Sequence, residues 1–122
     1  MKKRVVAIIQ AHMSSTRLPG KVLKDLMGKP ALYRMVERVR YAELIDDIVI
    51  ATSTKECDDI LEQFCREHGV LCFRGSDSDV LERFHGAAMQ YPADAYVRLT
   101  SDNPLLCPTQ IDLIVRTFLE NT

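Results

Sequence analysis

Four short apolar runs, rich in β-branched residues, alternate with longer amphipathic segments along the chain. The runs cover Arg4–Gln10, Asp47–Thr52, Val70–Phe73 and Ala95–Thr100. In the first two runs the apolar residues follow one another without intervening polar residues, which is typical of strands buried on both faces of a sheet. We therefore expect a parallel sheet covered by helices.

The segments that follow the runs have the apolar periodicity of helices. The first begins after Pro30, a residue tolerated in a first helical turn. Its apolar stripe consists of Leu32, Met35, Val36 and Val39. A last helix is expected to begin near Pro108, and its stripe consists of Ile111, Ile114, Val115 and Phe118.

Two further helices are predicted from capping boxes, in which a serine at the helix start pairs with an acidic residue three positions later. The first box is Ser53 with Glu56, followed by the stripe Ile60, Leu61 and Phe64. The second is Ser76 with Asp79, followed by the stripe Val80, Leu81, Phe84 and Ala88. The acidic residues around the first of these helices are interpreted as a solvated face: Glu56, Asp58, Asp59 and Glu62.

The alternation of strands and helices predicts a βαβ series. The expected fold is a Rossmann-like three-layer α/β sandwich with a mostly parallel sheet. The chain has 122 residues, of which 47% are hydrophobic and 27% are charged. This composition is that of an ordinary globular domain and argues against disorder. We expect one domain over residues 1–122.

The four cysteines, at positions 57, 65, 72 and 107, lack the two-residue gap that structural zinc sites and redox motifs favour. We interpret them as free thiols. No apolar run approaches the ~20 residues of a membrane span, and Val5–Ile9 is too short for the hydrophobic region of a signal peptide. A cytoplasmic location without membrane association is therefore expected.

Charge is distributed unevenly, although the formal net charge is only −1. The first 40 residues carry ten Lys or Arg against Asp25 and Glu37, whereas residues 41–122 carry six against fifteen Asp or Glu. This asymmetry predicts either a polyanion site near the N-terminus or simply a solvated basic helix face. A nucleic-acid surface usually needs a basic excess over the whole domain, so no nucleic-acid partner is expected.

The segment after the first run is long for a connection between a strand and a helix, where about 2 to 6 residues are common. It covers residues 11–21 and contains three hydroxyl side chains together with Arg17, Gly20 and Lys21. Hydroxyl and backbone N–H groups donate to phosphate oxygens, and the two cations supply charge. The segment predicts a triphosphate site, with a polar surface turn as the alternative. It has neither Walker-loop spacing nor a G-x-G motif.

Asp102 follows the last apolar run directly. Ligands of open α/β sheets bind at the carboxyl ends of the strands, and a carboxylate there can hold Mg²⁺ together with phosphate oxygens. The alternative is a turn or helix-cap aspartate before Pro104. Taken together with the first loop, we favour the metal-binding interpretation.

These motifs resemble the cytidylyltransferases that activate acidic sugars, namely the 3-deoxy-manno-octulosonate and acylneuraminate enzymes. The run Ser15–Lys21 looks like their signature loop. Within this family the chain is most similar to the spore coat polysaccharide biosynthesis protein F branch. Four stretches carry that similarity: Ile8–Met13, Ile48–Ser53, Arg74–Leu81 with Arg83, and Arg98–Pro104.

The resemblance implies a nucleotide-diphospho-sugar transferase-like fold and transfer of a cytidylyl group from CTP to an acidic sugar of a surface polysaccharide, with release of pyrophosphate. Mg²⁺ would be the cofactor, bound by Asp102. Ala11, His12 and Arg74 fall at nucleotide-binding positions, with the Ala11 backbone and Arg74 near the base. The phosphate-binding positions are Ser15, Arg17, Gly20 and Lys21. Lys21 and Arg17 would be the catalytic residues.

Two features depart from the family. His12 stands where the family loop normally has an arginine, which predicts weaker nucleotide binding or lost activity unless this histidine is a polar residue with no role. The chain also resembles only the N-terminal half of longer members. An unpaired strand edge would then favour self-association or a homodimer. A transferase that uses GTP or UTP, and a noncatalytic nucleotide-binding or assembly module, remain the alternatives.

Overall fold

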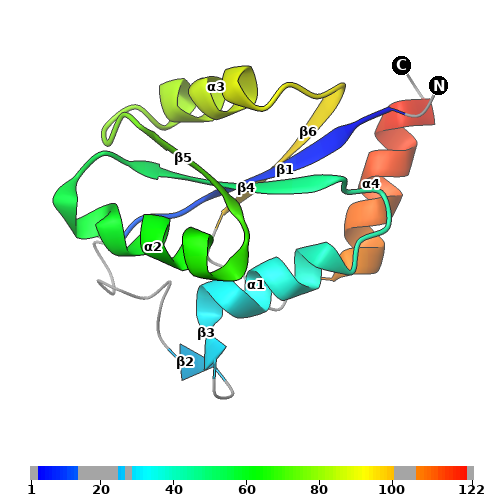
Figure 1. Ribbon diagram of the computed structural model, residues 1–122. Helices are drawn as coiled ribbons and strands as arrows, with labels where there is room; N and C mark the ends of the chain where they lie inside the picture. Colours follow the sequence, from blue (N-terminus) through cyan, green and yellow to red (C-terminus); the bar gives the residue numbers. More distant parts are fainter. Residues whose placement is uncertain (1–2, 14–24, 27–28, 101–106, 121–122) are drawn as a thin grey trace.

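The computed structural model describes residues 3–13, 25–26, 29–100 and 107–120, and its elements follow one another as Figure 1 shows. The strands are β1 (Val5–Gln10), β2 (Asp25–Leu26), β3 (Lys29–Pro30), β4 (Asp47–Ser53), β5 (Leu71–Gly75) and β6 (Ala95–Thr100). The helices are α1 (Ala31–Arg40), the 3-10 turn η2 (Glu56–Asp58), α2 (Asp59–His68), α3 (Val80–Gln90) and α4 (Pro108–Glu120).

The main sheet is parallel and has the strand order β5-β4-β1-β6. Strand β1 is central, and its Ile8 lies opposite Val49 of β4 and Arg98 of β6. All six residues of β1 are buried. The continuous apolar run thus predicted a strand covered on both faces, and this prediction is confirmed.

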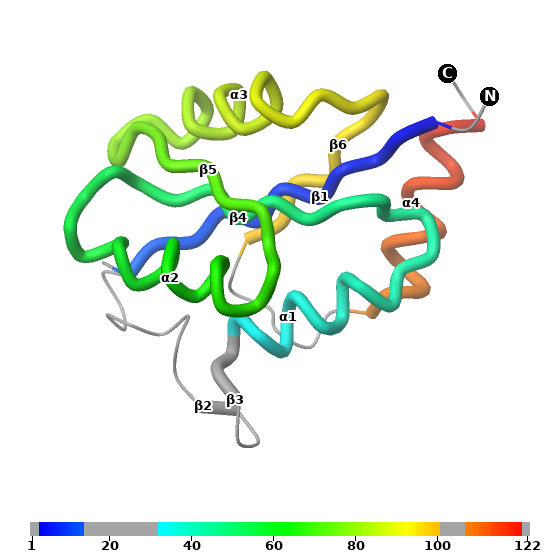
Figure 2. The backbone as a smooth tube through the Cα atoms, in the orientation of Figure 1, coloured from blue at the N-terminus to red at the C-terminus, as the bar shows by residue number. Residues whose placement is uncertain are grey.

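Helices cover both faces of this sheet, so the molecule has three layers (Figures 1 and 2). One face packs against α1, α2 and α4, through residues such as Met35, Leu61 and Val115. The other face packs against α3, through Ala87 and Phe84. The predicted Rossmann-like α/β sandwich is therefore confirmed. None of the helices in the described ranges is both long and apolar enough to cross a bilayer.

Helix α1 matches its prediction, because Leu32, Met35, Val36 and Val39 are all buried. Helix α2 ends at Gly69, whose φ of 66° is the left-handed conformation that glycine adopts at low cost. The four cysteines are free thiols, as expected.

The two capping boxes do not form as predicted. Ser53 is the last residue of β4, and its hydroxyl donates to Asp58 rather than capping a helix. Helix α3 is capped by Asp79, whose carboxylate accepts the Glu82 N–H at 3.0 Å. Ser76 accepts the Asp79 N–H at 3.1 Å, so this serine supports the turn before the cap. In both cases the strand and its turn extend further than a local serine signal indicates.

Three apolar stripes are only partly buried. Ile60 and Leu81 are exposed, and on α3 the buried side chains are Arg83 and Ala87. On α4, Ile111 and Val115 are buried, whereas Ile114 and Phe118 are exposed. Periodicity gives the helix but not its exact rotation, which depends on what packs against it. The small antiparallel pair β2–β3 was not predicted.

Candidate functional site

The carboxyl edge of the sheet brings together the two strand ends from which the loops with the predicted chemistry start. Gln10, the last residue of β1, lies opposite Thr100, the last residue of β6. On its other side Gln10 lies opposite Ala51 of β4. The chain runs from β1 outward through β4 to β5 and then returns to the opposite side of β1 with β6. The boundary between β1 and β6 is therefore the topological switch point, where open α/β sheets bind ligands.

Five of the predicted site residues lie outside the described residues: Ser15, Arg17, Gly20, Lys21 and Asp102. Their roles stay predictions. The described strand ends nevertheless place the starting points of both loops side by side, since residue 11 follows Gln10 and residue 101 follows Thr100.

Ala11 and His12 begin the first loop. Ala11 is buried, and its N–H donates to the carbonyl oxygen of Ala51 at 3.0 Å. His12 is exposed at the carboxyl edge. The chain is thus still held to β4 at Ala11 and turns toward solvent at the next residue.

Arg74, predicted to lie near the base, is located at the carboxyl end of β5 and is tied to the β4–α2 turn. Its Nε donates to the Ser53 carbonyl at 2.7 Å, and Nη2 donates to the Lys55 carbonyl at 2.7 Å. Nη1 donates to Asp59 at 2.6 Å. Burial lowers the pKa of Arg74, but the hydrogen bond and charge of Asp59 outweigh it and raise the pKa overall. Arg74 braces this turn, and its predicted contact with a base stays a prediction.

The interpretation of the acidic residues 56–62 as a solvated face is wrong for Asp58. Glu56 and Asp59 are exposed, but Asp58 is fully buried. Its Oδ1 accepts the Met13 N–H at 2.7 Å, and its Oδ2 accepts the Ser53 hydroxyl. The Ser53 oxygen in turn accepts the Lys55 N–H at 3.1 Å. No sequence signal distinguishes Asp58 from its exposed neighbours, because its burial depends on Met13 lying against it.

Arg83 is a second buried polar residue that the sequence analysis left without a role. It is 2% exposed, and its Nε donates to the Gln10 side-chain oxygen at 2.9 Å. Its Nη1 donates to the Ser76 carbonyl at 2.9 Å. Burial lowers the pKa of this guanidinium. Arg83 comes three residues after Val80 and four before Ala87, so the three residues share one face of the helix. A charged residue on this apolar face was the sequence signal that could have identified Arg83.

Arg83 and Gln10 together link three elements of the carboxyl edge. Gln10 donates from Nε2 to the Val80 carbonyl at 3.4 Å, which joins β1 to the start of α3. Within the described ranges, Arg83 has no carboxylate within ion-pair distance. An exposed ion pair between Lys55 and Asp77, at 3.1 Å, connects the adjacent turns.

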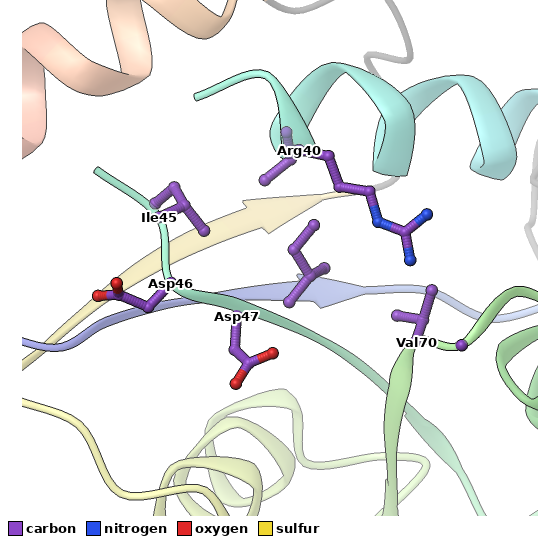
Figure 3. Close-up of a pocket in the computed structure, with 8 residues that line it drawn as sticks. Arg40, Ile45, Asp46, Asp47 and Val70 are labelled. Atoms are coloured by element: carbon purple, nitrogen blue, oxygen red, sulfur yellow. The ribbon is translucent and has the colours of Figure 1, made fainter. Parts of the chain in front are cut away.

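A hollow of about 190 Å³ lies at the opposite, amino edge of the sheet (Figure 3). Arg40, Asp46 and Asp47 contribute its polar side chains. Asp47 pairs with Arg4 at 2.8 Å, and Asp46 accepts the Val5 N–H at 2.7 Å. These carboxylates therefore hold the first residue of β1 and the residue before it. Because ligands of such sheets bind at the other edge, this hollow is not the candidate site.

No cluster of three or more metal-ligating side chains occurs among the residues that the structure describes. A parallel sheet whose strand order reverses between β1 and β6 defines an α/β domain of the kind that binds ligands at the carboxyl ends of its strands. The chain belongs to the cytidylyltransferase family, whose sequence model matches residues 6–122.

Curated relatives agree with this assignment. Over 116 residues the chain is 45% identical to the spore coat polysaccharide biosynthesis protein SpsF of Bacillus subtilis, covering 92% of this chain and 48% of that protein. It is 36% identical to the 3-deoxy-manno-octulosonate cytidylyltransferase of Chloroherpeton thalassium, covering 97% of this chain and 47% of that enzyme.

A solved cytidylyltransferase structure from Leptospira borgpetersenii superposes with a TM-score of 0.88 at 36% identity. The match covers 100% of this chain and 50% of the Leptospira protein. The chain thus spans about half the length of the relatives it matches. The fold is that of nucleotidyltransferases, as the sequence motifs implied.

Proposed function

We propose that this chain is the nucleotide-binding half of a cytidylyltransferase that transfers a cytidylyl group from CTP to an acidic sugar and releases pyrophosphate. The observation that carries the proposal is the pairing of Gln10 with Thr100, which starts both motif-bearing loops at one switch point. Similarity to SpsF and to a 3-deoxy-manno-octulosonate cytidylyltransferase favours a sugar acid of a surface polysaccharide as acceptor.

The residues of the first loop bind the triphosphate in this proposal. Ser15 and the backbone at Gly20 donate to phosphate oxygens, and Arg17 binds them with two parallel hydrogen bonds. Lys21 neutralises charge that develops on the α-phosphate and the leaving pyrophosphate. The Ala11 backbone and Arg74 border the base. His12 supplies less positive charge than an arginine would, which lowers the affinity for nucleotide.

Mg²⁺ is the proposed cofactor, held by Asp102, which comes two residues after β6 in the sequence. One carboxylate with substrate phosphate oxygens and water is a normal donor set for this ion. When bound, the ion would offset negative charge on the phosphates.

Calorimetric titration with CTP, GTP, UTP and ATP, each with and without Mg²⁺, tests the proposal. We expect binding that favours CTP and strengthens with Mg²⁺, and Asp102→Ala should remove mainly the effect of Mg²⁺. Equal binding of all four nucleotides would contradict the assignment of CTP. Binding of none would contradict nucleotide binding by this half alone.

A role in assembly is the second proposal, and the outer surface of β6 and α4 favours it. Strand β6 has a neighbour on one side only among the described residues. A groove of about 340 Å³ lies beside it, lined by apolar side chains that include Ile114 and Phe118. In relatives twice as long, further chain is available to cover such a surface. For this chain alone, we propose that a second copy covers it.

A further inference from the structure

Asp58 accepts two hydrogen bonds in the interior, from residues at the carboxyl ends of the neighbouring strands β1 and β4. Its carboxylate is fully buried. Oδ1 accepts the Met13 N–H from the start of the first loop, and Oδ2 accepts the hydroxyl of Ser53 from the end of β4. Both oxygens are therefore engaged by groups at the point where the loop leaves the sheet.

Helix capping does not account for this aspartate. Asp58 immediately precedes α2, the position where an aspartate usually accepts an N–H of the first helical turn. Its side chain makes no such bond. The carboxylate points instead to a residue 45 positions away in the sequence. Local helix formation thus gives no reason for an acid here.

The burial of this charge is costly. A carboxylate removed from water needs a cation or several donors in compensation. Within the described ranges no lysine or arginine lies within ion-pair distance of Asp58. The Met13 N–H and the Ser53 hydroxyl donate directly to this carboxylate, and Lys55 and Arg83 act on it only through longer-range attraction. The position of Asp58 is therefore tied to the geometry of Met13 and Ser53.

The Met13 contact completes a two-point attachment of the loop entry. Ala11 is held to β4 through its N–H, and Met13 is held to Asp58 through its own. The attachment ends two residues before Ser15, the first of the phosphate-binding positions in the proposed function. Groups that bind a phosphate gain affinity when their orientation is fixed before binding.

We propose that Asp58 is a positioning residue that fixes the entry of the triphosphate-binding loop. This inference rests on the proposed function. Asp58 does not contact the nucleotide, and its negative charge opposes a nearby triphosphate. Its benefit is therefore geometric, so an uncharged group with the same acceptor oxygen preserves it.

The test compares Asp58→Ala and Asp58→Asn with a matched control, Asp112→Ala. Asp112 also accepts backbone donors from a distant loop, the Glu43 and Leu44 N–H groups at 2.9 and 2.8 Å. Its loop leads into β4 at the amino edge. Hydrogen exchange of peptides covering residues 11–21 is measured without nucleotide, and the Kd for CTP with Mg²⁺ is measured by calorimetry.

Asp58→Ala should raise exchange in these peptides and weaken CTP binding by roughly tenfold, the effect of one lost charge-assisted hydrogen bond. Asp58→Asn should remain within about threefold of the parent in both readouts, because the amide oxygen still accepts the Met13 N–H and the amide nitrogen donates to Ser53. Asp112→Ala should lower thermal stability while leaving both readouts unchanged.

Unchanged exchange at residues 11–21 in Asp58→Ala, or an equal increase in Asp112→Ala, would overturn the inference. If Asp58→Ala does not fold, Ser53→Ala replaces it. That variant removes the hydroxyl donor, and a smaller rise in the same peptides is expected, with no rise counting against the inference. A parent protein that binds no CTP defeats the proposed function, whereas the exchange measurement still decides whether Asp58 holds the loop.

Discussion

The two edges of the sheet use carboxylates in different ways. At the amino edge, exposed acids hold the strand starts: Asp94 accepts the Arg4 N–H at 2.6 Å, and Asp46 accepts the Val5 N–H at 2.7 Å. At the carboxyl edge, Asp58, Gln10 and Arg83 are buried. Exposed polar groups lose little hydration when they form such bonds, so losing one partner changes the free energy of unfolding little. A buried polar group that loses its partner lowers the free energy of unfolding much more, because water cannot replace the partner.

This difference indicates where the fold tolerates change. The polar contacts of the amino edge hold the starts of strands and are exposed, so substitutions there should change stability little. At the carboxyl edge, Asp58 holds Met13 at the start of the first loop, and Gln10 and Arg83 hold the start of α3.

The largest effect is expected in the motif of the first loop. Lys21→Ala should weaken the binding of every nucleoside triphosphate by roughly 10- to 100-fold, because a charge-assisted contact to phosphate contributes ~1.5–3 kcal/mol whatever the base. Calorimetry with the four nucleotides measures this. Lys29→Ala, which changes the same charge outside the motif, serves as control. A loss confined to CTP would contradict phosphate binding by Lys21.

Arg83→Met should lower the free energy of unfolding by about 2–4 kcal/mol, because it leaves the Gln10 and Ser76 acceptors without their donor. Arg4→Met is the matched amino-edge variant. It removes a half-exposed ion pair with Asp47 and should cost no more than about 1 kcal/mol. Urea unfolding compares the two, and equal losses would show that the edges do not differ in this respect.

Self-association should depend on the outer surface of α4. Phe118, 54% exposed, lies in the groove beside β6. Phe118→Lys should weaken self-association by roughly tenfold, since burying one aromatic side chain contributes ~1.5–3 kcal/mol. Sedimentation over a range of concentrations measures this, with Leu81→Lys on the opposite face as control. A parent chain that stays monomeric at every concentration would contradict the proposed assembly.

The smallest effect concerns thiol reactivity. Hydrogen bonds from the backbone of Gln110 and Thr109 lower the pKa of the exposed Cys107. A lowered pKa means that more thiolate is present at a pH below the ordinary value, so alkylation at neutral pH should be a few-fold faster than at the exposed Cys57. The hydrogen bond with Cys72 and burial raise the pKa of Cys65, which should react last. Mass spectrometry after brief labelling reads these rates, and preferential labelling of Cys65 would contradict the expectation.

The extent to which the sequence predicted this structure differs between its apolar and polar residues. Strands β1, β4 and β6 and helix α1 follow from local runs and periodicity, because their apolar residues pack against the rest of the fold. Periodicity also predicted α4, although half of its apolar stripe is exposed. Ser53 was assigned to a helix cap, although its hydroxyl binds Asp58. A capping signal is short, and a strand that continues by one residue overrides it.

The candidate site was predictable only as motifs on loops. The motifs identified residues 11–21 and Asp102 as belonging to one site, and the pairing of Gln10 with Thr100 agrees with that expectation. Nothing in the sequence indicated that Arg74 braces the β4–α2 turn through three of its nitrogens. Such contacts join segments some twenty residues apart and have no periodicity to reveal them.

The sequence by itself determined the fold class, the order of the main-sheet strands and the helices, and the family, because these depend on local apolar patterns and contiguous motifs. Only the tertiary structure decided which polar residues are buried. Asp58 is interior because Met13 and Ser53 both donate to its carboxylate, and Arg83 is interior because Gln10 and Ser76 accept from its guanidinium. The burial of a charged side chain is settled by donors and acceptors from elsewhere in the chain, and these come together only when the sheet has formed.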